Sequence, residues 1–297
     1  MRKSKSLSDR MVTTFAYTFI GLFGILCLYP LLLTLSVSLS GEQEIVKHGY
    51  SVIPQGFTFN TYLYIFINSG QKILKSYGVT IFITVAGTLG AMLITSMIAF
   101  AISIKSLKYR NIIAFLCNFT IVFSAGLIPW YVVCVNYYGL KNSILALILP
   151  SIFSVWNMFL MRTYFSGISP SLYEAAKIDG ANYFRIYWEI AIPLSKTAIL
   201  TVGMMYALQY WNNWWYALIF INDKDKFPLQ YYLYSILSNV NAISSGRIPS
   251  GAAANIALPA ETVKMAVTII TIGPVLFLYP LVQKYFVQGI MTGAIKE

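Results

Sequence analysis

Residues 173–196 are the part of this sequence whose residue types and spacing best suit a specific polar interaction. The segment reads YEAAKIDGANYFRIYWEIAIPLSK and carries three of the ten acidic residues in the chain, Glu174, Asp179 and Glu189. The sequence around it is strongly apolar. A charged segment that also holds Gly180 and Pro193 is unexpected in so apolar a chain and raises the question of what it contacts.

The spacing within this segment predicts a short helix. Ser171 and Glu174 have the spacing of a capping box, in which each side chain bonds a free backbone amide, and Ser169 is the alternative cap. Gly180 ends the helix, because glycine adopts a left-handed conformation at little cost. The small side chains of Ala175-Ala176 would let a partner approach closely, and the alternative is an interfacial hairpin packed beneath the chain's own helices.

A second short helix is predicted from about Asn182 to Ile190, after which Pro193 redirects the chain into the next apolar run. Asp179 lies at the C-terminal end of the first helix, where the helix dipole disfavours a negative charge. We therefore expect Asp179 either to cap the second helix or to pair with a residue of another chain.

A second set of polar side chains lies inside an apolar run. Several of them recur three or four residues apart, which places them on one helix face. Amides inside a membrane generally face other helices or a cavity, which places this face toward a cavity or a neighbouring helix. Interfacial anchoring is the alternative for the two adjacent tryptophans, Trp214 and Trp215. The candidates for a substrate path are Tyr206, Gln209, Tyr210, Asn213, Trp214 and Asn157.

Composition defines the environment of these segments. Hydrophobic residues make up 58% of the chain and charged residues only 10%, whereas soluble domains carry about 25% charged residues. An apolar run of about 20 residues crosses a membrane as a helix. Six runs without a charged residue or histidine qualify, and they predict an all-α integral membrane protein with one transmembrane domain over residues 1–297. The predicted spans are 11–39, 77–104, 111–135, 143–161, 197–221 and 265–283.

The distribution of Lys and Arg predicts the orientation. Thirteen of the 21 basic residues fall on the side that holds both termini and residues 162–196, and eight fall in the longer loops on the other side. Basic residues concentrate on the cytoplasmic side of short loops. Both termini and residues 173–196 are therefore predicted to be cytoplasmic, and the loops 40–76 and 222–264 to lie outside, as connectors or as docking surfaces.

Several function classes are excluded by what the sequence lacks. The predicted spans contain no ionisable residue that would carry a coupled proton or ion. No Gly-Lys pair exists for a phosphate-binding loop. His48 is the single histidine, and all three cysteines fall within predicted spans. We therefore expect no catalytic site, no metal site and no cofactor in this chain.

The segment resembles a motif of a known family. Glu174-Ala-Ala176, then Gly180, then nine residues to Ile190-Ala-Ile192-Pro193 is similar to the EAA motif of ABC importer permeases, with Ile192 in place of leucine as the one departure. The likeness extends along the chain to the carbohydrate, maltose-type permeases, and near its end to the subgroup for complex oligosaccharides paired with lipoprotein binding proteins. The stretches that carry it are 29–30, 126–129, 147–150, 157–162 and 265–293.

The resemblance implies a permease subunit that translocates an oligosaccharide by alternating access across a bacterial cytoplasmic membrane. It implies a second permease in a heterodimer, two cytoplasmic ATPase subunits that bind ATP and Mg, and an extracellular lipoprotein substrate-binding protein. The residues between helices 4 and 5 would then form a coupling helix on the ATPase, and the C-terminal tail would also contact it. The coupling residues would be Glu174, Ala175, Ala176, Asp179, Gly180, Ala181 and Pro193, and the tail residues Gly289, Thr292, Gly293 and Lys296.

Alternatives remain at this level. The family resemblance also fits an importer of another polar solute, such as glycerol phosphate or a modified sugar. A passive channel subunit or a membrane scaffold is the alternative from a different class, because composition alone does not distinguish these from a driven transporter.

Overall fold

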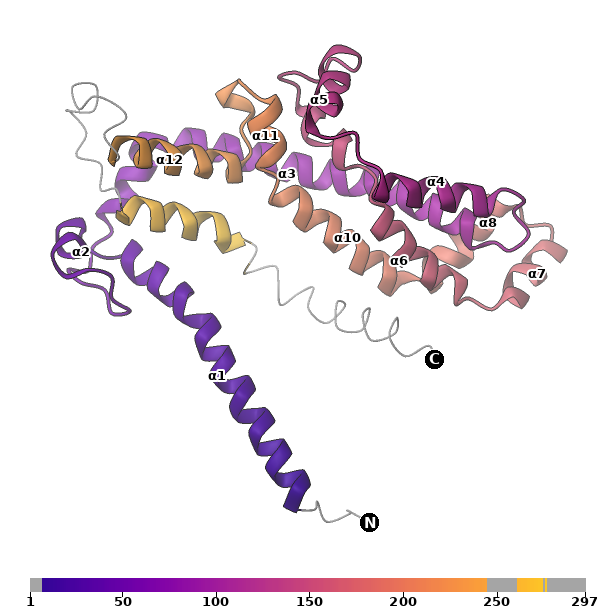
Figure 1. The fold of residues 1–297 in the computed structure, drawn as a ribbon, viewed down its shortest axis with the longest axis horizontal. Coiled ribbons are helices and arrows are strands. Elements are labelled where there is room, and N and C mark those ends of the chain that lie inside the picture. The colour runs from indigo at the N-terminus through magenta and orange to yellow at the C-terminus, as the bar shows by residue number, and fades with distance from the viewer. Residues whose placement is uncertain (1–6, 245–260, 275, 277–297) are drawn as a thin grey trace. The chain divides into compact units, whose positions relative to one another are not determined.

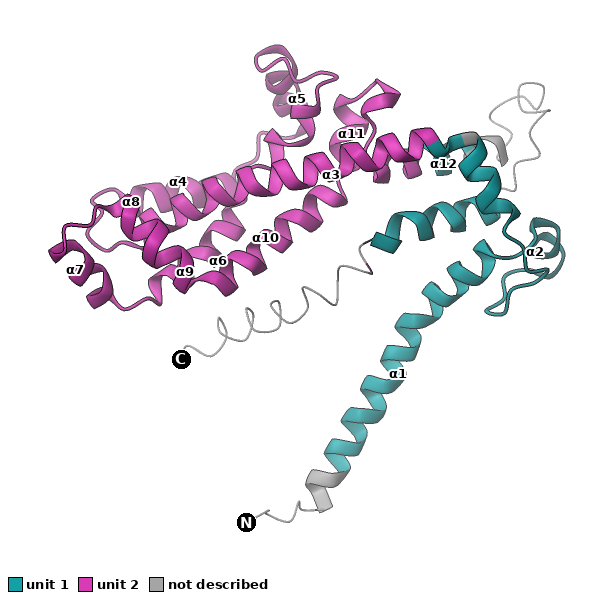
Figure 2. Cartoon of the chain, turned by 180° about the vertical axis from the view of Figure 1, so that it is seen from behind, with its two compact units in different colours: residues 1–70, 235–274 teal, residues 71–234, 275–297 magenta. Residues whose placement is uncertain are grey.

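The computed structural model describes residues 7–244, 261–274 and 276, and every regular element in those ranges is a helix (Figure 1). The all-α prediction is therefore confirmed for the described residues. The chain divides into two compact units, residues 1–70 with 235–274 and residues 71–234 with 275–297 (Figure 2). The second half of the predicted sixth span and the whole predicted tail contact lie outside the described residues.

The first unit begins with α1, Leu7–Ser38, an apolar helix whose stretch Met11–Ser38 is long enough to cross a membrane. Most of its side chains are exposed to the surroundings, as expected of a helix that faces lipid or a neighbouring subunit. The helix agrees with the predicted first span. A short helix, α2, Glu42–His48, follows within the predicted outer loop.

In this unit the Glu42 carboxylate binds the first described turn of the helical residues 261–274. Its oxygens accept hydrogen bonds from the backbone amides of Glu261 at 3.1 Å and Thr262 at 2.9 Å, and from the Thr262 hydroxyl at 2.8 Å. A negative charge at a helix N-terminus is favourable because the first amides lack partners within the helix. Tyr50 donates to Glu261 at 2.6 Å and Lys264 pairs with it at 2.9 Å.

The second unit is organised around the part of α3, Asn60–Ser103, that follows residue 70, and the stretch Ser69–Ser103 of this helix is a second candidate membrane span. The helix begins well before the predicted span 77–104, so the expectation of a loop over residues 60–76 is wrong. A helix that leaves the membrane continues to satisfy its own backbone, and its exposed turns accept polar side chains such as Lys72 and Lys75.

Three further predicted spans are broken rather than continuous. The third consists of α4, Arg110–Val122, and α5, Leu127–Asn136, which meet at 115° next to Gly126 at φ +84°. Only glycine adopts this conformation at little cost, so the bend falls there. The predicted continuous helix over residues 111–135 is therefore wrong.

The fourth and fifth spans also differ from their predictions. Two 3₁₀ turns, η1, Ile144–Leu147, and η2, Leu149–Ser151, lead at 50° into α6, Val155–Ser166. The fifth predicted span ends early, because α10, Lys196–Trp211, stops and a separate helix, α11, Trp215–Phe220, begins. Hydropathy continues across these breaks, which explains why composition alone predicts one helix.

The predicted outer loop over residues 222–264 also contains regular structure. After the short turn η4, Lys224–Lys226, the chain forms α12, Leu229–Ser244. The backbone amide of Leu229 donates to the buried Thr80 hydroxyl of α3 at 2.8 Å. This bond supplies one of the acceptors that the first turn of α12 lacks within the helix.

The larger core of the second unit lies where α4, α6 and α10 gather along the C-terminal half of α3 (Figure 1). Large side chains fill it, and Phe165, Tyr206 and Tyr210 are completely buried. Such packing makes this half of the unit a block in which neighbouring helices are joined by buried side chains.

Candidate functional site

The predicted coupling segment is a helical hairpin that begins with α7, Pro170–Ile178. Its end is closed by Gly180 at φ +81°, whose amide donates to the Lys177 carbonyl at 3.0 Å. The next amide, that of Ala181, donates to the Ala176 carbonyl at 2.9 Å. Together these bonds form a Schellman motif. The structure confirms the predicted glycine stop.

The beginning of α7 differs from the capping box. Ser169 occupies the N-cap position and Pro170 is the first helical residue, so Ser171 lies inside the helix. The two serine hydroxyls bond each other at 2.8 Å instead of capping the amides. The capping-box prediction for Ser171 and Glu174 is wrong, and the alternative start at Ser169 is correct, because proline fits the first helical position.

The second helix of the hairpin is capped by Asn182 rather than by Asp179. The Asn182 side chain accepts the backbone amide of Arg185 at 2.8 Å at the start of α8, Tyr183–Ile186. A π-helical turn, η3, Tyr187–Ala191, and a last turn, α9, Ile192–Leu194, carry the chain past Pro193 to an 85° bend into α10. Asp179 does not cap the second helix, and its side chain is exposed.

The hairpin has one exposed face and one face against its own helices. Glu174, Ala175 and Asp179 are exposed, and Ile178 is 87% exposed. Ala176 is buried in the chain's own core, so the two adjacent alanines point to opposite surroundings. The hairpin therefore presents Glu174, Ala175, Ile178 and Asp179 outward and packs Ala176 inward.

Aromatic and hydrogen-bonding contacts join the hairpin to the end of α3. Tyr187 and Ser96 bond through their hydroxyls at 2.7 Å. The Phe100 ring makes an edge contact with Tyr173 of α7 at 6.0 Å and a tilted contact with Tyr187 at 5.4 Å. The sequence does not reveal these three contacts, because each joins residues more than 70 positions apart. A displacement of the hairpin would therefore be passed to α3 directly.

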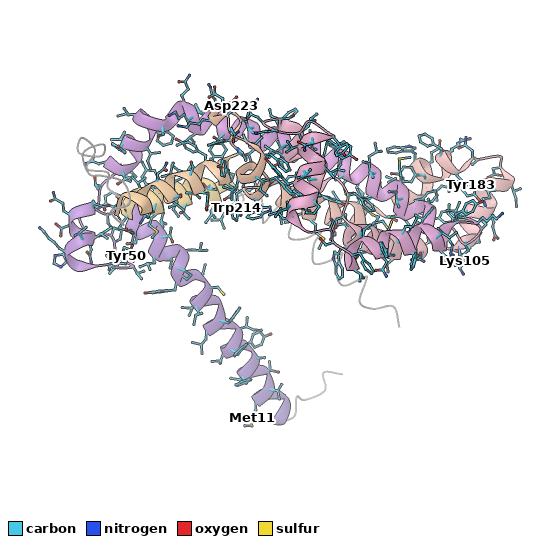
Figure 3. The ribbon with its side chains drawn as sticks, turned by 45° about the horizontal axis from the view of Figure 1, so that its top comes forward. Met11, Tyr50, Lys105, Tyr183, Trp214 and Asp223 are labelled. Atoms are coloured by element: carbon cyan, nitrogen blue, oxygen red, sulfur yellow. The ribbon has the colours of Figure 1, made fainter. Side chains whose placement is uncertain are left out.

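The turn after α3 also contacts the hairpin. Lys177 donates to the Tyr183 hydroxyl at 2.9 Å and lies over its ring at 4.5 Å from the centroid, and Ser106 reaches the same hydroxyl at 3.3 Å. The hydrogen bonds from Lys177 and Ser106 lower the pKa of Tyr183. Figure 3 shows Lys105 and Tyr183 close together at one end of the second unit, with Asp223 and Trp214 towards its other end.

The residues predicted to line a substrate path separate into two groups. Tyr206, Tyr210 and Asn213 are buried and hold helices together. The Tyr206 hydroxyl bonds that of Thr95 at 2.6 Å and accepts the amide of Ser154 at 2.9 Å. Tyr210 donates to the Ile148 carbonyl at 3.0 Å, and Asn213 donates to the Leu147 carbonyl at 2.9 Å. These three side chains therefore form hydrogen bonds with backbone groups at η1, η2 and the start of α6, where the helix is interrupted.

The remaining candidates lie elsewhere. Gln209 and Trp214 are exposed, whereas Asn157 is 5% exposed within α6. The Trp214 ring stacks on Tyr234 of α12 at 5.0 Å and meets Trp215 edge-on at 5.6 Å. Nearby, Gln230 donates to Asn212 at 3.3 Å. Aromatic rings and amide side chains therefore lie side by side between the end of α10, the start of α11 and α12.

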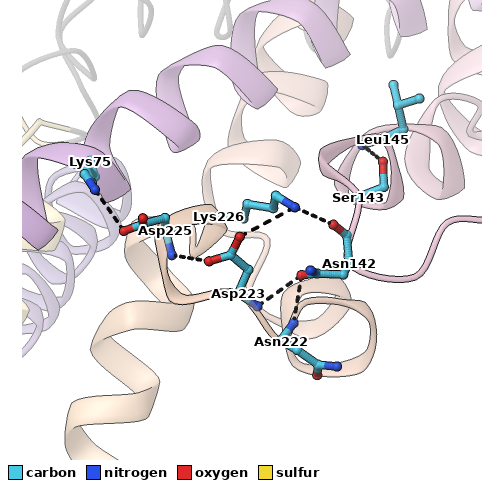
Figure 4. Close-up of polar contacts among 8 residues, drawn as sticks. All are labelled: Lys75, Asn142, Ser143, Leu145, Asn222, Asp223, Asp225 and Lys226. Atoms are coloured by element: carbon cyan, nitrogen blue, oxygen red, sulfur yellow. Dashed lines mark hydrogen bonds and ion pairs between the residues drawn. The ribbon is translucent and has the colours of Figure 1, made fainter.

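Asn142 joins two loops near this region (Figure 4). Its side-chain oxygen accepts the amides of Asn222 at 3.2 Å and Asp223 at 3.0 Å, and its carbonyl accepts the Lys226 ammonium at 2.9 Å. Asn142 itself has φ +56°, a conformation that asparagine tolerates better than most residues. Lys75 of α3 pairs with Asp225 at 3.0 Å. The loop before α12 is thus fixed to both α3 and the turn before η1.

The described residues contain no cluster of histidine, cysteine, aspartate and glutamate that would hold a metal ion. The predicted ATPase-contacting residues Gly289, Thr292, Gly293 and Lys296 lie outside the described residues. That contact stays a prediction.

Comparison with known proteins defines the class. No protein-family model matches the chain. It is 35% identical, over 98% of its length and the whole of the relative, to the polygalacturonan/rhamnogalacturonan transport system permease protein YtcP of Bacillus subtilis. It is 36% identical to protein LplC of the same organism, over 94% of this chain and 92% of that one.

A solved structure agrees. The crystal structure of a bacterial ABC transporter involved in the import of the acidic polysaccharide alginate contains a chain with a TM-score of 0.83 and 32% identity, covering 95% of this chain and 99% of that one. A more distant relative, 26% identical over the whole of both chains, is the arabinooligosaccharides transport system permease protein AraQ of Halalkalibacterium halodurans.

The chain therefore belongs to the permeases of sugar ABC transporters. It is an integral membrane permease subunit of a bacterial importer of oligosaccharides. Permeases of this family act as transport components together with a partner permease, an ATPase and a substrate-binding protein. The resemblance carried by the EAA motif is confirmed.

Proposed function

We propose that the hairpin of α7, α8 and η3 is the coupling element through which a separate ATPase drives this permease. The observation that supports the proposal is the combination of an exposed face, with Glu174, Ile178 and Asp179, and a buried face joined to α3 by Phe100 and Tyr187. A segment that only connected two spans would not need both. Glu174, Ala175, Asp179 and Gly180 would contact the ATPase, while Ala176, Ala181 and Pro193 would keep the hairpin in shape.

The proposal includes the arrangement in the membrane. The whole chain forms one permease domain with six spans, three of them broken, and both termini in the cytoplasm. It pairs with a different permease in a heterodimer, with two ATPase subunits that hold ATP and Mg, and with an extracellular lipoprotein that delivers substrate. The tail residues Gly289, Thr292, Gly293 and Lys296 add a second contact with the ATPase. The distribution of basic residues supports the orientation.

The test is co-purification of the assembled transporter carrying Glu174→Lys. A lysine at this exposed position reverses the charge without disturbing the core, so we expect the permease to remain in the membrane and lose its ATPase subunits. Glu44→Lys, at a half-buried glutamate of α2 in the outer loop, is the control and should retain them. Retention of the ATPase at wild-type stoichiometry by the Glu174→Lys complex would exclude this coupling site.

We further propose that the substrate is an oligosaccharide from an acidic polysaccharide. The relatives named for polygalacturonan/rhamnogalacturonan and for alginate are both above 30% identical to this chain, whereas the arabinooligosaccharide permease is at 26%. The predicted spans contain no basic residue. The carboxylates of the sugar would therefore be recognised by the binding protein or the partner permease, and this chain would contact hydroxyls and ring faces.

Gln209, Trp214 and Asn157 are the side chains that we propose for that path, with Tyr206, Tyr210 and Asn213 as the groups that shape it. Substrate-stimulated ATPase activity of the whole complex tests the substrate class. Galacturonate oligosaccharides should stimulate hydrolysis more strongly than arabino-oligosaccharides of equal length. The reverse order would indicate a neutral substrate and leave the coupling proposal intact.

A further inference from the structure

The second unit contains an apolar hollow of about 460 Å³ at the end that we propose to be cytoplasmic. This hollow is here called the apolar groove. It begins along the last turns of α3 and continues beneath the turn that follows the helix. Phe184 and Tyr187 of the hairpin form its opposite wall. The apolar side chains that α3 and its turn contribute are Met97, Phe100, Ala101, Ile104 and Leu107, and the turn also contributes Ser106 and Lys108.

A second hollow of about 320 Å³, the basic pocket, adjoins the apolar groove. The two share Phe100, Ile104, Ser106 and Tyr183 as walls. Four basic side chains line the basic pocket and only one acidic side chain, Glu174, does so. The basic ones are Lys105, Arg110, Arg162 and Lys177.

These four cations are not neutralised by carboxylates. Within residues 7–244, 261–274 and 276, none of them forms an ion pair, whereas Arg185, a few residues away, pairs with Glu189 at 2.8 Å. Their contacts are with neutral groups, such as the Tyr183 hydroxyl for Lys177 and the Asn111 side chain for Arg110. A pocket with this excess of positive charge is electrostatically suited to an anion.

The order of the two hollows along α3 matches the order of the apolar and charged parts of a lipid at a membrane surface. The candidate membrane span within α3 ends at Ser103. The apolar groove begins along the span before this residue, and Lys105 and Arg110 lie just beyond it. Hydrocarbon would meet the apolar groove and a headgroup would meet the basic pocket.

We propose that the apolar groove and the basic pocket together bind one phospholipid with an anionic headgroup, with an acyl chain in the groove and the phosphate in the pocket. Basic pockets at the cytoplasmic ends of membrane helices suit anionic headgroups, and burial of methylene groups adds to the attraction. The site requires a membrane surface at the end of α3, and its placement on the cytoplasmic side rests on the orientation proposed above. A partner helix fits less well, because an apolar helix would leave the four cations without counter-charges.

The experiment uses the full-length chain in its assembled transporter, purified into nanodiscs of phosphatidylcholine with a minor fraction of phosphatidylglycerol. Native mass spectrometry after release from the disc counts the retained lipids. We expect the wild-type complex to retain phosphatidylglycerol, and Lys105→Gln/Arg162→Gln to reduce the retained fraction at least tenfold. Lys72→Gln/Lys141→Gln removes two exposed basic residues outside both hollows and should leave retention unchanged. Co-purification of all subunits shows that each variant is folded.

Three results would overturn the proposal. Equal retention of phosphatidylglycerol by the wild type and the Lys105/Arg162 variant would show that the lipid binds elsewhere. Displacement of the lipid by millimolar glycerol phosphate would indicate a site for a soluble phosphate compound. A photoreactive residue at Met97 that cross-links to a protein subunit instead of lipid would show that a partner covers the groove. Loss of the lipid with ATPase coupling retained would leave the proposed function standing, so the two proposals fail separately.

Discussion

Tyr210 of α10 lies directly against Gly87 of α3. A Cβ atom added at Gly87 would come within 2.6 Å of the Tyr210 ring, closer than real side chains approach one another. The same tyrosine donates its hydroxyl hydrogen to the Ile148 carbonyl at 3.0 Å. One side chain thus joins the central helix of the second unit to the broken segment at η1 and η2, and the absence of a side chain at residue 87 permits it.

We predict that Gly87→Ala destabilises the permease. The added methyl group must push the buried Tyr210 ring away, and overpacking of this kind costs about 1–3 kcal/mol. The measurement is the thermal midpoint of the purified complex. Gly90→Ala is the control on the same helix, because a Cβ there meets Ile152 at 3.5 Å, an ordinary contact. Equal midpoints for the two variants would contradict the close packing.

We predict that Tyr206→Phe lowers stability without changing the apparent affinity for substrate. The change leaves the Ser154 amide without its acceptor, at a cost of about 1–3 kcal/mol. Gln209→Ala, on the exposed face of the same helix, should show the opposite pattern of unchanged stability and a higher KM. Transport assays and thermal midpoints on both variants check the pair. A raised KM for Tyr206→Phe alone would reverse the assignment of the two faces.

Part of this structure could be predicted from the sequence and part could not. Hydropathy identified α1 and the membrane part of α3, because a long apolar run has few alternatives to a spanning helix. It did not locate the breaks at Gly126 and before α6, since the apolar character continues through them. Helical spacing placed Gln209 and Tyr210 in one polar stripe, but it does not reveal that Tyr210 faces a glycine more than 120 residues earlier in the chain.

The coupling hairpin was more accessible to sequence reasoning. Gly180 as the stop of α7 follows from local backbone preference alone, and the structure agrees. The N-cap residues of α7 and α8 are more difficult to predict, because several polar residues near the start of each helix fit the same local pattern. Ser169 occupies the N-cap position of α7 without bonding an amide of the helix, whereas the Asn182 side chain caps α8. The signal that would have found the second is its position directly before the helix, where asparagine is among the preferred residues.

We predict that Asn142→Ala loosens the loop before α12 more than Asn142→Gly does. Both changes remove the acceptor for the amides of Asn222 and Asp223, but alanine also adds the strain of a positive φ, about 1–2 kcal/mol. Hydrogen exchange at residues 222–227 measures the loosening. Equal exchange in the two variants would show that the positive φ contributes nothing there.

We predict an acid-sensitive contribution from the contact between Tyr50 and Glu261. The hydrogen bonds from Tyr50 and Lys264 lower the pKa of Glu261, so this carboxylate contributes stability above its unfolded pKa and loses it as the pH falls through the folded pKa. The bond to Glu261 raises the pKa of Tyr50 to about 12, so its contribution is complete below about pH 10 and is lost as the pH rises towards that value. The thermal midpoint of Tyr50→Phe should therefore approach that of the wild type as the pH falls through the folded pKa of Glu261, which lies below the ordinary range for a glutamate.

The control for this pH dependence is Tyr137→Phe, since Tyr137 is 80% exposed. Its thermal midpoint should follow that of the wild type throughout. A constant difference between wild type and Tyr50→Phe from neutral to acid pH would mean that the carboxylate is not the group that titrates.

We predict that Gly180→Val uncouples ATP hydrolysis from substrate while Gly180→Asn does not. Gly180 holds φ +81°, which costs a β-branched residue about 1–2 kcal/mol or more, whereas asparagine tolerates it. A Cβ at this position meets nothing within 4 Å in the chain itself, so the strain falls on the backbone turn between α7 and α8. Substrate-stimulated ATPase activity of the assembled transporter measures the effect. If the asparagine variant is also uncoupled, a contact of the glycine surface with the ATPase is the cause. If the valine variant is stimulated normally, the fixed angle of the hairpin plays no part in coupling.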